Sequence, residues 1–187
     1  PYSLIRDLFS NRFGIKRSDS SSEMREKLER GVRSVVSGKT DWQSAFQHIG
    51  ELLGFEIGEN PGSQTETRST KSFYNQALVY LEEYFKNLTL EAPLVILLED
   101  LHWTDDSSLK LIAHINTHLA QYPILIVATA RPSFFSHYPD WLKDLKNMTR
   151  IDLHQLTLRD SQQLISEILQ KVQDLPLQIG DLILSRA

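Results

Sequence analysis

The stretch from Pro93 to Asp106, PLVILLEDLHWTDD, constrains the fold of this chain more than any other. Its five apolar residues, Leu94–Leu98, lie between a proline and two carboxylates, Glu99 and Asp100. A short and wholly apolar run of this kind predicts a strand that is buried on both faces, as in a parallel sheet. Because ligands of open α/β sheets bind outside the carboxyl ends of such strands, we expect the two acids at the edge of a binding site.

The acid pair of Glu99 and Asp100 suits a site for Mg²⁺ and a nucleotide, because Mg²⁺ prefers oxygen ligands and keeps several of its waters. Glu99 is then expected to take the metal side, and Asp100 to polarise an attacking water. Adjacent acids at the end of an apolar strand are costly unless they are solvated or paired, which favours a role in binding. The structural alternative is that both carboxylates cap the start of a neighbouring helix.

A second apolar run, Ile124–Ala128, continues into Thr129 and Arg131. The carboxyl ends of parallel strands meet at one edge of a sheet, so we expect Arg131 beside Glu99 and Asp100. A guanidinium there can neutralise charge on a transferred phosphoryl group. The alternative is a surface arginine paired to one of the acids. Thr129 is expected either to bind a water of the site or simply to end the strand.

Composition bounds the class of protein. The chain has 187 residues, of which 41% are hydrophobic and 24% charged, as in an ordinary globular domain. A net charge of -4 disfavours a nucleic-acid-binding surface. The absence of cysteine excludes disulfides and thiolate sites. No apolar run approaches the roughly 20 residues of a membrane span, and the first residues do not resemble a signal peptide. We therefore expect a cytoplasmic protein that binds neither nucleic acid nor membranes.

Helical spacing of apolar residues predicts several helices before the first strand. The first covers about residues 4–13, and a capping box at Ser20–Glu23 opens the second. Asp41 is expected to cap a third helix. Residues 54–69 are rich in Gly, Pro, Ser and Thr, which predicts a loop, and a longer helix follows over residues 70–88.

After the first strand, helices and strands alternate. The further elements expected are a helix over 107–121, the strand Ile124–Ala128, a loop and short helix over 134–145, a short strand at Ile151–Leu153, a helix from a capping box at Thr157–Asp160 to about 172, and a last helix from 176. This order is typical of a parallel sheet with right-handed crossovers. The predicted fold class is α/β, with a short parallel sheet flanked by helices and a helix-rich N-terminal half.

Three residues after the acid pair have two interpretations each. His102 can transfer protons or simply pack, and packing is favoured. Trp103 can stack on a base or partner loop, but a Trp at a strand-to-helix turn more often covers the edge of the core. Asp105 is expected to be the N-cap of the next helix and to accept a hydrogen bond from a backbone N–H near Ser108.

His114 and His118 lie one helical turn apart, a spacing that can bind a metal ion. The sequence shows no third ligand, so no metal is expected there.

Gly38-Lys39-Thr40 superficially resembles a phosphate-binding loop. Such a loop needs a glycine five residues before Gly38, where this chain has Arg33, and it must follow a buried strand rather than a helix. We expect Gly38 to end the second helix in a left-handed conformation instead.

The segments LVILLEDLHWTDDSSL and LIVATARP resemble the STAND branch of AAA-like P-loop NTPases. Similar modules occur in bacterial proteins with an adenylate/guanylate cyclase domain and in large transcriptional regulators. The resemblance implies a Rossmann-like three-layer fold with a Walker B strand ending in Glu99 and Asp100. It also implies a sensor strand ending in Arg131, with Mg²⁺ and ATP as cofactors bound through Glu99, Asp100, Thr129 and Arg131. Neighbouring domains of the same protein would receive the signal.

The family's phosphate-binding loop, GxxxxGK followed by Ser or Thr, lies upstream of the matching segments. The 187 residues are therefore expected to form a single partial NTPase domain: helices over 1–90, the two strands over 91–155 and C-terminal helices over 156–187. On this expectation the piece alone binds no cofactor and is not catalytic. Without the strand that carries the loop, the sheet would have exposed edges, which predicts a rearranged sheet or self-association.

The function expected from the resemblance is an ATP-binding and ATP-hydrolysing regulatory switch in a bacterial signalling protein. The alternative is a non-enzymatic scaffold for protein interactions, in which Glu99 and Asp100 are remnants of a degenerate nucleotide site.

Overall fold

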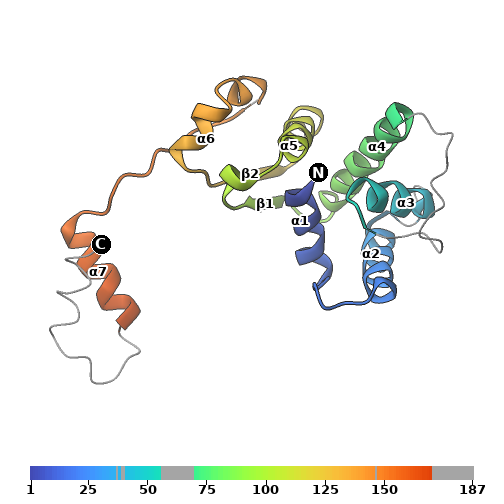
Figure 1. The fold of residues 1–187 in the computed structure, drawn as a ribbon, viewed down its shortest axis with the longest axis horizontal. Coiled ribbons are helices and arrows are strands. Elements are labelled where there is room, and N and C mark those ends of the chain that lie inside the picture. Colours follow the sequence, from blue (N-terminus) through green and yellow to red (C-terminus); the bar gives the residue numbers. More distant parts are fainter. Residues whose placement is uncertain (37, 39–40, 56–69, 146, 170–187) are drawn as a thin grey trace. The chain divides into compact units, whose positions relative to one another are not determined.

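The computed structural model describes residues 1–36, 38, 41–55, 70–145 and 147–169 (Figure 1). The elements are the helices α1 (Ser3–Phe13), α2 (Ser21–Val36), α3 (Trp42–Leu52) and α4 (Thr70–Leu88), the strand β1 (Leu94–Leu98), the 3-10 helix η1 (Leu101–Trp103), α5 (Asp106–His118), β2 (Ile124–Ala128), α6 (Pro132–His137), the 3-10 helix η2 (Trp141–Asp144) and α7 (Leu158–Leu169). The chain divides into two compact units, Pro1–Met148 and Thr149–Ala187. The fold is mixed α/β and rich in helix.

The two strands form a parallel sheet, as the sequence predicts. Leu94 lies opposite Ile124, and Leu98 lies opposite Ala128, so the two strands end together. Helix α5 connects them, and it ends at His118 rather than at residue 121. In the described residues the sheet contains β1 and β2 alone.

The prediction that β1 is buried on both faces is wrong. Successive side chains of a strand point to opposite faces, and the two faces of β1 differ sharply. Leu98 is 3% exposed and packs in the same core as Ile112 of α5, whereas Leu97 is 66% exposed. The other side chains of the exposed face are Val95, Leu125 and Val127. Within the described part of the chain, helices therefore cover one face of the sheet.

The predicted strand at Ile151–Leu153 does not form. Both apolar side chains of this segment are exposed, and its backbone pairs with no strand among the described residues. An apolar–polar–apolar triplet becomes a strand only where a neighbouring edge accepts its hydrogen bonds.

The capping box that follows is confirmed, because Thr157 Oγ1 accepts a hydrogen bond from the Asp160 amide (3.2 Å) and donates one to Asp160 Oδ2 (2.6 Å). Helix α7 begins at Leu158. The predictions for residues 170–187 lie outside the described residues.

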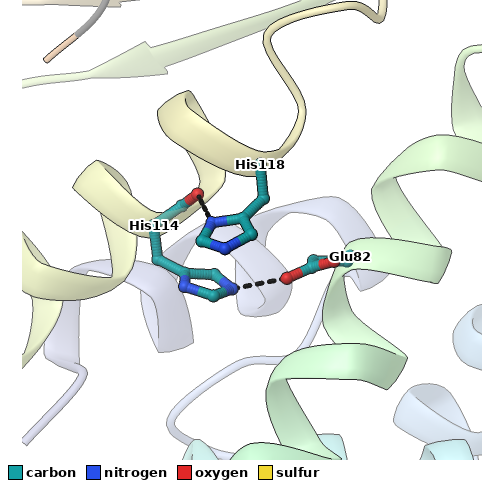
Figure 2. A group of neighbouring side chains, drawn as sticks. All are labelled: Glu82, His114 and His118. Carbon is teal, nitrogen blue, oxygen red and sulfur yellow. Dashed lines mark hydrogen bonds and ion pairs between the residues drawn. The ribbon is translucent and has the colours of Figure 1, made fainter.

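The helices of the N-terminal half share a core with the sheet. Helices α2, α3 and α4 pack against one another, and α1 packs against α2 and α5. Buried members of the core include Phe9, Leu28, Val32, Ile49, Leu81, Tyr84, Ile96 and Leu109. Helices α4 and α5 also make a polar contact, in which His114 Nε2 lies 2.5 Å from Glu82 Oε1 (Figure 2).

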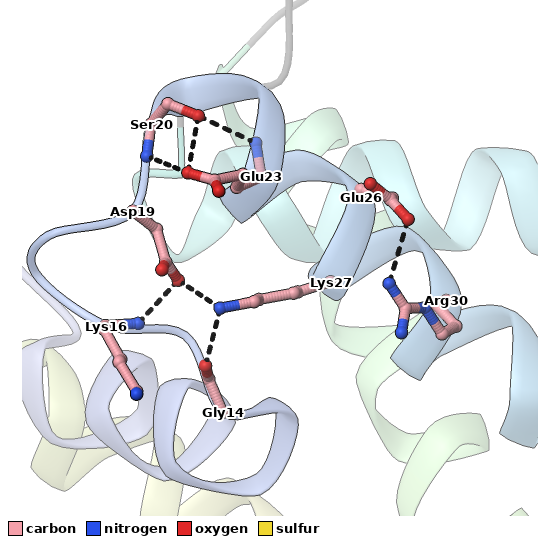
Figure 3. Close-up of polar contacts among 8 residues, drawn as sticks. All are labelled: Gly14, Lys16, Asp19, Ser20, Glu23, Glu26, Lys27 and Arg30. Carbon is pink, nitrogen blue, oxygen red and sulfur yellow. Dashed lines mark hydrogen bonds and ion pairs between the residues drawn. The ribbon is translucent and has the colours of Figure 1, made fainter.

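The start of α2 shows the predicted capping box (Figure 3). Ser20 Oγ accepts a hydrogen bond from the Glu23 amide (3.3 Å), and Glu23 Oε2 accepts one from the Ser20 amide (2.8 Å). Beside it, Lys27 Nζ donates to Asp19 Oδ2 (2.6 Å) and to the Gly14 carbonyl oxygen (3.0 Å). These contacts fix the turn between α1 and α2, because one ammonium bonds to both sides of it.

Two further local predictions are confirmed. Asp41 caps α3 by accepting hydrogen bonds from the amides of Gln43 and Ser44. Gly38 follows the end of α2 and has a φ of 95°, a conformation that glycine adopts at little cost. It is therefore a residue of the helix end, as expected. The loop predicted over 54–69 lies outside the described residues from position 56 onward.

Candidate functional site

The carboxyl ends of β1 and β2 are joined by backbone and side-chain hydrogen bonds. The Thr129 amide donates to the Leu98 carbonyl oxygen (2.9 Å), and the Leu101 amide donates to the Thr129 carbonyl oxygen (2.9 Å). Between these two bonds, the Asp100 amide donates to Thr129 Oγ1 (3.1 Å). Thr129 therefore does more than end the strand, because its hydroxyl holds the backbone of Asp100 against β2.

Asp100 adopts a left-handed backbone conformation, with φ 55° and ψ 47°. Such a conformation is uncommon outside glycine and costs free energy, although Asp tolerates it better than most residues. It turns the chain sharply from β1 into η1. Asp100 precedes η1 but makes no side-chain cap hydrogen bond, so the helix-capping alternative is not observed for this residue. Glu99 and Asp100 are both exposed.

Exposed carboxylate oxygens at the end of a strand are the kind of ligand that Mg²⁺ takes together with waters. Glu99 and Asp100 directly follow β1, and Thr129 directly follows β2. Each of these side chains carries an oxygen that can bind a metal ion. These side chains therefore fit a Mg²⁺ ion, because they offer the oxygen ligands that it prefers.

Arg131 lies at the same edge, as expected from the parallel register. It is exposed and is the N-cap of α6. Among the described residues it forms no ion pair with Glu99 or Asp100, so the alternative of a paired surface arginine is not observed. Buried Phe134 anchors α6 to the core, which holds the backbone of Arg131 in place.

His102 and Trp103 of η1 differ in burial, although their ring centroids lie 5.1 Å apart. The His102 side chain is 7% exposed, so the packing interpretation is confirmed. Its two ring nitrogens are buried without a hydrogen-bond partner among the described residues, and Nδ1 lies 3.8 Å from Asp100 Oδ1, too far for a hydrogen bond. Trp103 is 77% exposed, so the prediction that it covers the core edge is wrong. The tight turn of η1 directs Leu101 and His102 inward and leaves Trp103 outside.

Asp105 is the N-cap of α5, as predicted, and it has a second role that the sequence did not reveal. Its carboxylate accepts hydrogen bonds from the Ser108 amide (3.0 Å) and hydroxyl (2.9 Å) within its own helix. It also accepts bonds from the amides of Tyr2 and Ser3 (both 2.9 Å) and from the Ser3 hydroxyl (2.7 Å) at the start of α1. Burial opposes ionisation of Asp105, but these hydrogen bonds outweigh it and lower its pKa well below the usual value.

His114 and His118 have an acidic neighbour that the sequence does not reveal. His114 and His118 of α5 share one face of the helix, and Glu82 of α4 completes the group (Figure 2). One ligand-type atom from each residue lies within 4.8 Å of the others. Glu82 precedes His114 by 32 positions and lies on another helix, so no local spacing points to it.

No family model and no solved structure matches the chain. An uncharacterized protein of Rhizobium meliloti (strain 1021) is 41% identical over 106 residues, which cover 57% of this chain and 10% of that protein. The match thus spans about a tenth of the relative's length. None of the helices in the described residues is long and apolar enough to cross a membrane.

Proposed function

We propose that this chain is part of a STAND-type P-loop NTPase and supplies the metal-and-sensor edge of an ATP-dependent regulatory switch. The observation that carries the proposal is the hydrogen bond from the Asp100 amide to Thr129 Oγ1. It ties the acid pair to the strand that leads into Arg131. Acids and a guanidinium thereby share the edge of a parallel sheet at which ligands of open α/β folds bind.

Each residue has a distinct task in the proposed site. Glu99 holds the water shell of the metal ion, and Asp100 orients the attacking water. Arg131 contacts the terminal phosphate and stabilises the charge that develops on it during transfer. A bound Mg²⁺ would neutralise charge on the phosphate oxygens. Contact between Arg131 and the terminal phosphate makes the position of α6 sensitive to hydrolysis, which is how the site would act as a switch.

The 187-residue sequence contains no GxxxxGK phosphate loop followed by Ser or Thr. In P-loop proteins the loop backbone and its lysine supply much of the affinity for phosphates. The test therefore uses the longest natural protein that contains this chain together with its upstream sequence. Binding of Mg²⁺–ATP is measured by calorimetry, and hydrolysis by release of inorganic phosphate.

The wild-type protein is expected to bind Mg²⁺–ATP saturably and to hydrolyse it. Arg131→Ala is expected to lower the rate of hydrolysis by about 1,000-fold, the usual lower bound for a transition-state arginine. Asp100→Ala should slow hydrolysis more than it weakens binding, because its task is to orient the water. Arg30→Ala, which removes an exposed arginine from α2, serves as the control. Equal hydrolysis by the wild-type protein and the Arg131 and Asp100 variants would contradict the proposal.

A scaffold for protein interactions is the second candidate function. The exposed face of the sheet, formed by Val95, Leu97, Leu125 and Val127, favours it, as does the exposed ring of Trp103. Apolar side chains gathered on a surface are typical of interaction sites. If the longest natural protein binds no nucleotide with or without Mg²⁺, the scaffold replaces the switch as the better proposal.

A further inference from the structure

We propose that Glu82, His114 and His118 form a transition-metal site between α4 and α5, with Zn²⁺ as the best-matched ion. Two imidazoles and one carboxylate are an established protein donor set for Zn²⁺. None of the three residues takes part in the proposed nucleotide site. The inference is therefore independent of the proposed function.

The helices bring the three side chains together. His114 and His118 are four residues apart on α5, so they lie on one face of the helix. Their rings are stacked, with centroids 3.9 Å apart and an interplanar angle of 24°. Figure 2 shows Glu82 reaching from α4 toward this pair, with Oε1 2.5 Å from His114 Nε2.

The hydrogen bond of His118 leaves one ring nitrogen available to a metal ion. His118 Nδ1 lies 3.0 Å from the His114 carbonyl oxygen. A carbonyl oxygen only accepts, so Nδ1 carries the proton, and in the neutral ring Nε2 keeps its lone pair. A backbone carbonyl that holds the distal N–H in this way is the usual outer-shell partner of a metal-binding histidine.

Closing the site takes small shifts of the ligand atoms and a rotation of one imidazole, because a metal ion lies in the plane of each ring that binds it and the two rings are stacked with centroids 3.9 Å apart. Two ligands of a tetrahedral Zn²⁺ ion with bonds of about 2.1 Å lie about 3.4 Å apart. The ligand-type atoms lie within 4.8 Å of one another, so the widest separation closes by shifts on the order of 1 Å. The short contact between Glu82 and His114 opens as the ion replaces the proton between them. Because His118 is exposed and the other two side chains are partly exposed, water can take the fourth position.

The competing interpretation is that Glu82 and His114 form a simple hydrogen-bonded pair that joins α4 to α5. His118 would then contribute nothing to Zn²⁺ binding. The two interpretations differ in what they predict for His118→Ala, and this difference decides the experiment.

The test measures Zn²⁺ affinity of the untagged 187-residue chain by competition with a chromophoric chelator. One Zn²⁺ per chain is expected. Glu82→Gln and His118→Ala should each weaken binding by at least about tenfold, because loss even of an outer-shell partner costs that much. His137→Ala is the matched control, since His137 Nδ1 also lies near the carbonyl oxygen four residues before it, at 2.8 Å, and it lies outside the three-residue group.

Far-UV circular dichroism verifies that each variant is folded. The visible absorption spectrum of the Co²⁺-loaded wild-type chain tests the ligation geometry without any substitution. Tetrahedral ligation by nitrogen and oxygen should produce strong d–d absorption. The proposal is overturned if the wild-type chain shows no saturable Zn²⁺ binding or no such Co²⁺ spectrum. It is also overturned if His118→Ala binds as tightly as the wild type, or if His137→Ala loses as much affinity as His118→Ala.

Discussion

Replacement of Asp105 by alanine is expected to destabilise the fold by about 2–4 kcal/mol. Its carboxylate accepts hydrogen bonds from the starts of two helices, α1 and α5, which are about a hundred residues apart in sequence. Loss of this one side chain therefore removes a local cap and a long-range connection together.

The magnitude follows from the surroundings of each donor. Loss of the α5 N-cap costs about 1 kcal/mol. Ser108 is fully buried, and its hydroxyl loses the acceptor Asp105 Oδ2, which costs about 1–3 kcal/mol. The amides of Tyr2 and Ser3 are only partly buried or exposed, so water can replace the carboxylate and they add little.

Urea denaturation followed by far-UV circular dichroism measures the change in the free energy of unfolding. Asp41→Ala is the matched control, because in the described parts of the chain the Asp41 carboxylate bonds only to Gln43 and Ser44 of its own helix α3. Asp105→Ala should cost clearly more than Asp41→Ala. An equal or smaller cost would mean that neither the buried Ser108 hydroxyl nor the bonds from α1 add to the local cap, and the reasoning would be refuted.

The lowered pKa of Asp105 also gives the stability a definite dependence on pH. The folded pKa lies below the ordinary aspartate value of 3.8, so the unfolded state binds more protons in acid. The contribution of Asp105 is therefore present above about pH 4 and decreases as the pH falls toward the folded pKa. Asp105→Asn keeps an acceptor oxygen without the charge, so its unfolding free energy should fall less than that of the wild type between about pH 5 and pH 2. Equal pH dependence of the two proteins would contradict this account.

Two further predictions test the packing by the same denaturation assay. Leu98→Ala removes a buried side chain and should cost about 2–5 kcal/mol, whereas Leu97→Ala on the exposed face should change stability by only about 0.5 kcal/mol; equal costs would mean that something covers both faces of β1. Gly31→Ala places a Cβ against the Phe13 ring, and the required shift should cost about 1–3 kcal/mol despite the better helix propensity of alanine. Ser34→Ala on the same helix is the control, and a stabilising Gly31→Ala would show that the ring moves freely.

The amino-acid sequence by itself determined the local features of this protein. The capping boxes at Ser20–Glu23 and Thr157–Asp160 and the caps at Asp41 and Asp105 were predictable, because donor and acceptor lie within three residues of each other. The two apolar strands were predictable from their composition. Their parallel pairing placed Glu99, Asp100 and Arg131 at one edge, as expected, since parallel strands end on the same side. The roles of those residues in binding a nucleotide stay predictions.

Only the tertiary structure decided which surfaces meet. The sequence shows that β1 is apolar on both faces, but only the packing of the helices reveals that Leu97 is exposed. Ile151–Leu153 has the pattern of a strand, yet no neighbouring edge pairs with it among the described residues. Glu82 reaches His114 because α4 and α5 are neighbours in space, and Asp105 caps α1 for the same reason. The last two contacts join segments far apart in sequence, so no local pattern of residues encodes them. The exposure of Leu97 and the unpaired segment Ile151–Leu153 likewise depend on which distant elements pack nearby.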